Sequence, residues 1–207
     1  IGRADVLSSW AGVRPVVADG RPGSAGKKPS DEKREHALWV EPGCVTLAGG
    51  KLTTFRLLAL EVLQACAGFV GRALVDTGSA VFAAMPALPL PGLSATQQRR
   101  LAGRYGRALP RLAELLAELG LERVGATETL WVELAFAAEA EMVLHLDDLL
   151  LRRTRLGLLL AHGAAAELPR IRELCQARLG WDDPRWAREQ ESYLNLWQRC
   201  YSLPADA

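Results

Sequence analysis

The spacing of the hydrophobic residues changes near residue 93 and divides the chain into two predicted modules. Before that point, short apolar runs alternate with turns that hold most of the glycines and prolines. After it, leucine and alanine recur every three or four residues, which is the period of an amphipathic helix. The predicted fold class is therefore mainly α, with a small α+β part in residues 1–93 and an all-α helical domain in residues 94–207.

In the first module, the pattern predicts two strands and then a helix. Residues 35–40 alternate, residues 44–48 form a short apolar run, and Pro42-Gly43 provides the turn between them. The spacing becomes helical at Thr53 and stays so for roughly 16 residues. Ahead of these elements, residues 19–33 combine turn formers with charged residues, a composition typical of a surface loop.

In the second module, the apolar stripes predict a succession of helices. Gly120 and Gly180 are expected just beyond two of their ends, and Asp182 or Asp183 is expected to cap the last one. The aromatic side chains of that last helix have the spacing of a core-facing stripe. The predicted helical segments are residues 109–119, 131–142, 146–160, 168–179 and 184–201.

Charge and composition remove several classes of function. With 25 basic and 24 acidic residues the net charge is +1, so no long-range field favours nucleic acid. The 4 cysteines show no CxxC and no Cys/His cluster, so we expect free thiols that pack as small apolar residues and no metal site.

No uninterrupted apolar run reaches the ~18 residues that a membrane-spanning helix needs, so no such helix is predicted. The chain begins with Ile1 rather than methionine, and we expect it to be part of a longer protein.

Three histidines and a cluster of arginines have simpler structural interpretations. His36, His145 and His162 are far apart in sequence and match no catalytic pattern, so we interpret them as packed or surface residues. The arginines at 152, 153 and 155 follow Asp147 and Asp148, and pairing between neighbours on one helix would satisfy them.

The segment LAGGKLTTFR, residues 47–56, carries the strongest local signal of a binding site. Two glycines and a lysine separate a predicted strand from a predicted helix, so unpaired N–H groups and the positive end of the helix dipole would face an electron-rich group. Glycines without Cβ atoms would let such a group approach closely. Val45 and Leu52 depart from the phosphate-binding pattern GxxxxGK[ST], which excludes a P-loop. A purely steric need for glycine in the turn remains the alternative.

Four segments occur in a characteristic order: DVLSSWAGVRP (5–15), KREHALWV (33–40), AGGKLTTFRLLALEVL (48–63) and HLDDLLLRRTRLGLLL (145–160). Together they resemble the FAD-dependent glycerol-3-phosphate dehydrogenases, the flavoproteins that pass electrons to respiratory quinone. The dinucleotide-binding pattern GxGxxG is absent from the 207 residues, so the chain resembles the C-terminal part of such an enzyme: the tail of the FAD and substrate region, followed by the helical domain.

The resemblance implies an activity, which is oxidation of sn-glycerol 3-phosphate to dihydroxyacetone phosphate. It implies FAD in the full-length protein and none in this fragment, which would be inactive. By the same resemblance, Gly49, Gly50, Lys51, Leu52 and Thr53 contact the flavin, and Lys51 also faces the reacting oxygen.

The substrate contacts implied by the resemblance are two arginines. Arg14 and Arg34 would bind the phosphate, because a guanidinium fork can bind phosphate oxygens bidentately. The family also implies a cytoplasmic enzyme peripheral to the inner membrane, with a quinone acceptor and a homodimer among the expected partners. The rival hypothesis is that residues 94–207 form a non-enzymatic helical interaction or dimerisation module.

Overall fold

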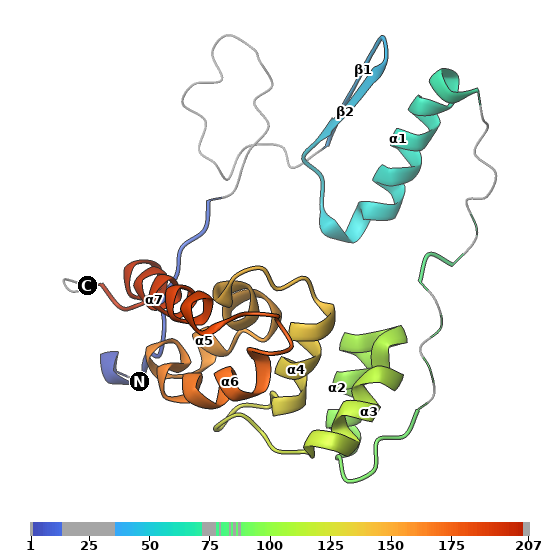
Figure 1. Cartoon of the computed structure of the whole chain (residues 1–207). Coiled ribbons are helices and arrows are strands. Elements are labelled where there is room, and N and C mark those ends of the chain that lie inside the picture. Colours follow the sequence, from blue (N-terminus) through green and yellow to red (C-terminus); the bar gives the residue numbers. More distant parts are fainter. Residues whose placement is uncertain are drawn as a thin grey trace. The chain divides into compact units, whose positions relative to one another are not determined.

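The computed structural model describes residues 2–13, 36–71, 78, 80–82, 84, 86 and 88–204. Contacts divide the chain into two compact units (Figure 1). The hairpin unit comprises residues 12–82, and the helical unit comprises residues 83–207 together with residues 1–11. The predicted surface loop at residues 19–33 lies outside the described residues. The mainly α fold class with a small α+β part is confirmed, while the predicted boundary at residue 93 stays a prediction.

The hairpin unit has the predicted order of two strands and a helix. Strands β1 (Ala37–Glu41) and β2 (Cys44–Ala48) pair antiparallel, with Ala37 opposite Ala48 and Glu41 opposite Cys44. Gly43 takes a φ of 77° in the turn between them, a conformation that favours glycine. Helix α1 (Phe55–Val70) packs beside β2 and ends at Gly71, which has a φ of 64°.

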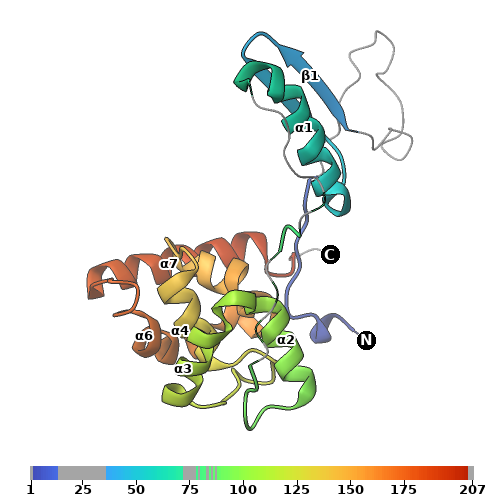
Figure 2. The ribbon, with the colours of Figure 1, turned by 90° about the vertical axis from the view of Figure 1, so that its right-hand side faces the viewer.

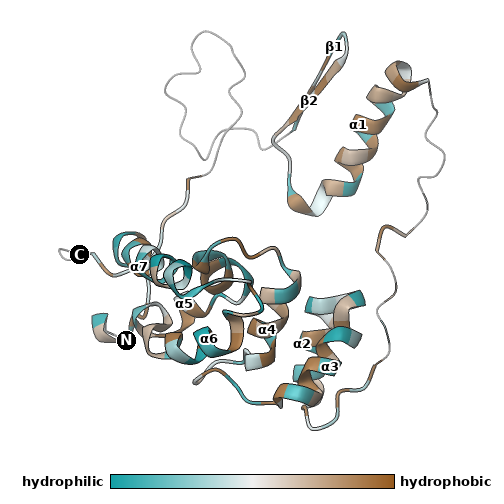
Figure 3. Cartoon of the chain, in the orientation of Figure 1, coloured by the Kyte–Doolittle hydropathy of each residue, from teal (hydrophilic) through white to brown (hydrophobic). Residues whose placement is uncertain are grey.

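Helix α1 presents much of its apolar surface to solvent. Leu58 is its buried residue, although hydrophobic residues lie around most of the helix (Figure 3). With the preceding turn it forms a helical segment of 19 residues, long and apolar enough by length and composition to cross a membrane. The sequence pattern predicted no such segment because charged residues interrupt the apolar runs, but the span Leu52–Val70 ends before Arg72. A core helix of a soluble protein passes the same test.

The helical unit packs its helices around two hydrophobic clusters (Figure 2). Buried leucines of α2 and α3 form one cluster with residues of α4, and the other lies between α4, α6, α7 and the segments that connect them. The helices are α2 (Ala95–Tyr105), α3 (Leu109–Leu119), α4 (Trp131–Ala140), α5 (Leu156–Leu159), α6 (Leu168–Cys175) and α7 (Asp183–Cys200).

The ends of these helices follow the local sequence. Asp182 caps α7, since its Oδ1 accepts from the backbone N–H of Arg185 at 2.7 Å, and Ser94 accepts from the N–H of Gln97 at the start of α2. Gly120 follows α3 with a φ of 81°, and Gly180 follows the turn after α6 with a φ of 66°. The predicted end of α3 at Gly120 and the cap of α7 at Asp182 are confirmed, whereas α6 ends at Cys175, before the predicted end at Gly180.

Residues 146–160 do not form the single helix that their leucine spacing predicts. A π-helical turn covers Asp148–Arg153, and Arg155 then takes a left-handed φ of 60° before the short helix α5. The reason is the packing of Gly157, whose carbonyl accepts from the Trp197 indole N–H at 2.7 Å. A Cβ on Gly157 would lie 2.4 Å from the Tyr193 hydroxyl oxygen. This segment is bent so that its backbone can lie against the aromatic face of α7.

That aromatic face is core, as predicted. Of the predicted residues, Trp186 and Trp197 are buried and Tyr201 is partly buried. Tyr193 is buried as well, and its hydroxyl donates to the carbonyl of Gly163 at 2.6 Å. Burial raises the pKa of the Tyr193 phenol, with a further contribution from the Asp147 carboxylate. The hydroxyl therefore stays a donor in the folded protein.

A buried carboxylate joins α2 to α4. The side chain of Glu133 is 2% exposed and accepts from both terminal nitrogens of Arg100, at 2.9 and 2.6 Å. It also accepts from the Tyr105 hydroxyl at 2.9 Å and from the backbone N–H of Leu130 at 2.8 Å. Burial and this carboxylate raise the pKa of Tyr105. Four donors thus compensate one buried charge.

The predicted burial of the cysteines is only partly confirmed, whereas the predicted ion pairing of Arg152 is confirmed. Cys175 is buried, which raises its pKa to about 12, but Cys44 and Cys200 are exposed, so the prediction that all four thiols pack inside is wrong. The predicted pairing of Arg152 is confirmed, at 2.6 Å to Asp147 and 2.9 Å to Asp148. Within the described residues, no group of three His, Cys, Asp or Glu side chains could hold a metal ion.

Candidate cofactor and substrate site

The GGK turn, residues 49–51, connects strand β2 to helix α1. Gly49 and Gly50 take φ values of 81° and 85°, in the left-handed region that favours glycine. Lys51 then returns to an extended conformation, and a 3-10 turn, Leu52–Thr54, leads into α1. Two consecutive left-handed residues reverse the chain sharply, so the strand ends directly at the start of the helix.

Gly50 is required by packing within the hairpin unit as well as by its backbone conformation. A Cβ at this position would lie 2.6 Å from Cδ1 of Leu58 and 3.5 Å from Cβ of His36. The space that a side chain would need is therefore filled by α1 itself. At Gly50, the steric explanation for a glycine holds, and close approach of a ligand is not needed to explain it.

The outer side of the turn is open. Lys51 and Thr53 are exposed and Leu52 is 88% exposed. The hydroxyl and the N–H of Thr54 both donate to the carbonyl of Lys51, each at 3.0 Å. The first N–H groups of a helix have no partner within the helix. The turn therefore places an exposed lysine directly before the start of a helix, where the N–H groups of Thr54 and Phe55 are bonded to carbonyls of the turn.

His36 lies beside the GGK turn, at the start of β1, and is held by α1. Its Nε2 is 2.7 Å from the Glu61 carboxylate, and both side chains are partly exposed. This contact gives His36 a structural role that joins the start of β1 to the middle of α1. No role in catalysis is assigned to it.

The two arginines expected to bind phosphate, Arg14 and Arg34, lie outside the described residues. The segment that precedes Arg14 is described, and it packs on the helical unit. The Ser8 hydroxyl donates to the Leu158 carbonyl at 3.0 Å. Ser9 donates from its N–H to the Tyr201 carbonyl at 2.8 Å and from its hydroxyl to the Ser202 carbonyl at 3.0 Å.

Ser8 and Ser9 were not among the residues that the sequence patterns singled out. Their signal is two adjacent hydroxyl residues inside DVLSSWAGVRP, a segment that was interpreted only through its arginine. Because donors and acceptors of these bonds are about 150 and 193 positions apart, no local pattern could pair them.

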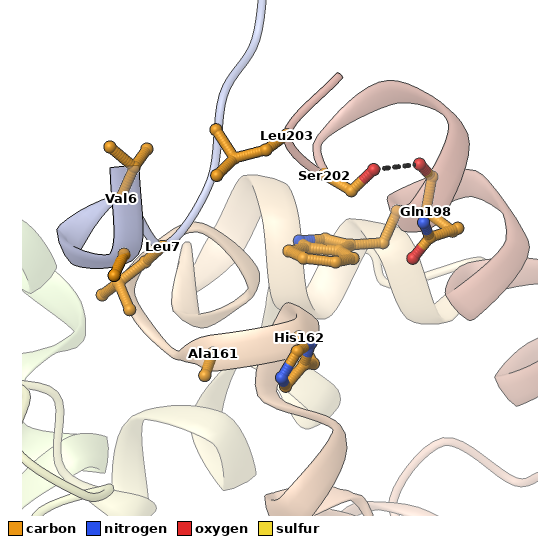
Figure 4. A pocket seen from close by; sticks show the side chains of 9 residues that line it. Val6, Leu7, Ala161, His162, Gln198, Ser202 and Leu203 are labelled. Carbon is orange, nitrogen blue, oxygen red and sulfur yellow. Dashed lines mark hydrogen bonds between the residues drawn. The ribbon is translucent and has the colours of Figure 1, made fainter. Parts of the chain in front are cut away.

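A hollow lies beside this segment, between residues 4–7, the segment before α6 and the end of α7 (Figure 4). Its volume is about 360 Å³, and Val6, Leu7 and Leu203 form much of its apolar lining. His162 reaches it from a backbone with a left-handed φ of 52° and lies edge-on to the Trp197 ring, 6.4 Å between centroids.

Sequence comparison identifies the family. Residues 45–186, more than half of the chain, match the C-terminal domain of alpha-glycerophosphate oxidase. The chain belongs to this family. Both the GGK turn and the bent segment at residues 146–160 fall inside the matched range. No solved structure matches the chain.

Relatives of this alpha-glycerophosphate oxidase C-terminal domain carry a consistent name. Glycerol-3-phosphate dehydrogenase 2 of Mycobacterium tuberculosis is 30% identical over 92% of this chain and 35% of its own length. Glycerol-3-phosphate dehydrogenase 1 of the same species is 33% identical over 76% of the chain and 32% of its length. The mitochondrial enzyme of Bos taurus is 29% identical over 93% of the chain and 28% of its length. The chain thus spans about a third of each relative.

Proposed function

We propose that this chain is the C-terminal part of an FAD-dependent sn-glycerol-3-phosphate dehydrogenase, which oxidises its substrate to dihydroxyacetone phosphate. The observation that carries the proposal is the GGK turn, an exposed lysine at the start of a helix, inside a domain of the alpha-glycerophosphate oxidase family. The matching relatives with the name glycerol-3-phosphate dehydrogenase support the substrate.

The donors at the GGK turn suit the ring edge of FAD. Gly49, Gly50, Lys51, Leu52 and Thr53 would hold it, because backbone N–H groups and an ammonium stabilise negative charge. When bound, FAD accepts a hydride from the secondary alcohol of the substrate. The role of Lys51 is to keep a positive charge close to the flavin edge and the reacting oxygen.

Arg14 and Arg34 are proposed to bind the substrate phosphate. A guanidinium stays charged at working pH and can donate two parallel hydrogen bonds to phosphate oxygens. Loss of one such contact should weaken binding by roughly 1.5–3 kcal/mol. The proposal extends to a quinone acceptor, a location at the cytoplasmic side of the inner membrane, and a homodimer.

The exposed apolar face of α1 fits this proposal. A chain that spans about a third of its relatives leaves the rest of such an enzyme to cover Leu52, Leu57 and Leu63, which are exposed here. On its own the chain is expected to bind no flavin and to have no dehydrogenase activity.

The test uses the full-length enzyme with single substitutions. Arg14→Ala should lower turnover of glycerol 3-phosphate at least tenfold while bound flavin is retained, as expected for loss of one charge-assisted contact of roughly 1.5–3 kcal/mol. Arg107→Ala, which removes an exposed arginine of the helical unit, is the matched control and should leave turnover unchanged. Unchanged turnover in Arg14→Ala would remove that residue from the site.

A further inference from the structure

The hollow at the end of α7 lies entirely within the helical unit. One wall is the N-terminal strap, which we define as residues 3–9, and the other comes from the segment before α6 and from the end of α7 (Figure 4). The strap is fastened at both ends. The Arg3 guanidinium donates to the Pro204 carbonyl, and Ser8 and Ser9 donate to backbone carbonyls of α5 and of the residues that follow α7. Hydrogen bonds that flank the hollow thus hold its two walls in place.

The space between these walls is largely apolar and is not filled by the chain. Val6 and Leu7 are 41% and 48% exposed, and they line the hollow together with Leu203. Protein interiors normally leave few gaps larger than a water molecule, and apolar surfaces that stay apart in water gain nothing from burial. The volume of about 360 Å³ falls within the roughly 300–1,000 Å³ of small-molecule sites. The strap therefore leaves a preformed space of ligand size.

A left-handed turn fixes His162 at the wall of this hollow. His162, Gly163 and Ala164 have φ values of 52°, 69° and 62°, a conformation that residues with a side chain rarely adopt. Packing holds the turn, because a Cβ on Gly163 would lie 2.8 Å from Cγ of Trp197 and the Gly163 carbonyl accepts from the Tyr193 hydroxyl. Backbone strain of this kind is concentrated where proteins contact ligands.

Two aromatic rings form a corner in the hollow. The His162 and Trp197 rings are inclined at 68°, with 6.4 Å between their centroids, and both residues line the space. A flat aromatic ring can stack on one ring of such a corner and meet the other edge to face. The geometry favours a planar ligand over a branched or globular one.

The polar groups of the lining indicate what the ligand carries. The Ser202 hydroxyl donates to the Gln198 carbonyl (Figure 4), so its oxygen can offer a ligand only acceptor capacity. An imidazole nitrogen of His162 can also accept. None of the nine described lining residues is Asp, Glu, Lys or Arg. A phosphate or carboxylate would find no cation in this lining, whereas a neutral hydroxyl donor would find acceptors.

We propose that the hollow is a binding site for a small, flat, uncharged aromatic molecule with a phenolic hydroxyl. His162 and Trp197 contact its ring, Val6 and Leu7 cover it, and Ser202 accepts from its hydroxyl. The inference goes beyond the proposed function and does not depend on it. It gives the helical unit a ligand of its own, of a chemical class different from glycerol 3-phosphate.

The test uses this chain with 2-naphthol as the probe, followed by amide NMR. Residues 161–163 and 198–203 should show saturable shifts. Leu7→Trp fills the hollow from the strap and Ala161→Trp fills it from the opposite wall, and each should weaken binding about tenfold or more. Two variants from different walls keep the test valid if Leu7→Trp detaches the strap. Leu144→Trp, the same change at a leucine that is 65% exposed and does not line the hollow, is the matched control and should bind like the parent.

Related probes test the chemistry of the site. 2-Methoxynaphthalene lacks the donor and should bind about threefold to tenfold more weakly than 2-naphthol, and the charged 2-naphthoate should bind more weakly still, because its carboxylate would be desolvated without a cation. His162→Asn tolerates the left-handed backbone but removes the ring, and should weaken 2-naphthol about threefold.

Three results would overturn the proposal. The first is the absence of saturable shifts at residues 161–163 and 198–203, including shifts confined to the exposed face of α1. The second is parent-like affinity in both Leu7→Trp and Ala161→Trp. The third is equal binding of 2-naphthol and its methyl ether, which would refute the hydroxyl contact that defines the ligand.

Discussion

Gly50 lies against the side chain of Leu58, so that a Cβ at this position would lie 2.6 Å from Cδ1 of Leu58 and would displace that methyl group. Gly50→Ala combines a left-handed φ of 85° with a 2.6 Å contact to Leu58. We expect roughly 2–3 kcal/mol of destabilisation of the hairpin unit, measured by amide exchange in residues 37–48.

Gly43→Ala provides the matched control for that substitution. Gly43 has a φ of 77° and open space around it, so it reports the backbone strain alone, about 1 kcal/mol. Equal effects at the two glycines would show that the contact with Leu58 contributes nothing.

Gly157→Ala should destabilise the helical unit by roughly 2–4 kcal/mol. The new methyl would lie 2.4 Å from the Tyr193 hydroxyl oxygen and 3.3 Å from the Leu150 carbonyl, and that hydroxyl is already bound to Gly163. Urea denaturation measures the change. Gly103→Ala, in α2 with nothing nearby, should instead be neutral or stabilising by up to about 1 kcal/mol, and a similar loss in both variants would refute the packing argument.

Glu133→Gln should destabilise the helical unit by roughly 2–4 kcal/mol, because it leaves the Arg100 guanidinium without its partner. Glu128→Gln is the control, since Glu128 pairs with Arg123 at 2.8 Å where both side chains are exposed, and such pairs contribute about 0–1 kcal/mol. Thermal unfolding followed by circular dichroism measures the stability of the Glu133→Gln and Glu128→Gln variants. A Glu133 variant as stable as the Glu128 variant would contradict the importance of the buried network.

Glu141 should make the protein less stable as the pH rises. Its Oε2 is buried without a hydrogen-bond partner among the described residues, and burial raises the pKa of this carboxyl above 4.5 even though Arg104 and Arg153 act to lower it. An acid with a raised folded-state pKa stabilises fully below its unfolded pKa, and that stabilisation is lost as pH rises through the folded pKa.

Glu141→Gln should therefore gain stability relative to the parent as pH rises from about 4 to about 8, measured by urea denaturation at each pH. Glu191→Gln changes an exposed glutamate of α7 and should follow the parent at every pH. A constant difference between Glu141→Gln and the parent would show that this carboxyl does not titrate with a raised pKa.

Local patterns predicted the elements whose ends are defined by their own residues. The hairpin around Pro42-Gly43, the length of α1 and the cap of α7 at Asp182 all follow from turn chemistry and helical spacing. Local patterns did not predict the bend at Arg155, because it depends on the packing of Gly157 against Tyr193, a residue of another helix. Leucine spacing alone favours a straight helix there.

Of the contacts described here, the sequence likewise predicted those between neighbouring residues and not those between distant ones. The residues of the GGK turn are contiguous, so a sequence motif could find them. The hydrogen bonds of Ser8 and Ser9 join residues about 150 and 193 positions apart, and the Arg100 to Glu133 pair links two separate helices. Such contacts exist only after tertiary packing, which no periodicity encodes.

The most direct measurement of the central claim is the anaerobic reduction of bound flavin by glycerol 3-phosphate in the full-length enzyme, followed by loss of its visible absorbance. The parent protein should be reduced, and Lys51→Ala should be reduced at least tenfold more slowly at saturating substrate, because removal of one preorganised charge beside the reacting groups raises the barrier by roughly 1.5–4 kcal/mol. A parent enzyme that glycerol 3-phosphate does not reduce, or a Lys51 variant reduced at the parent rate, would contradict the account.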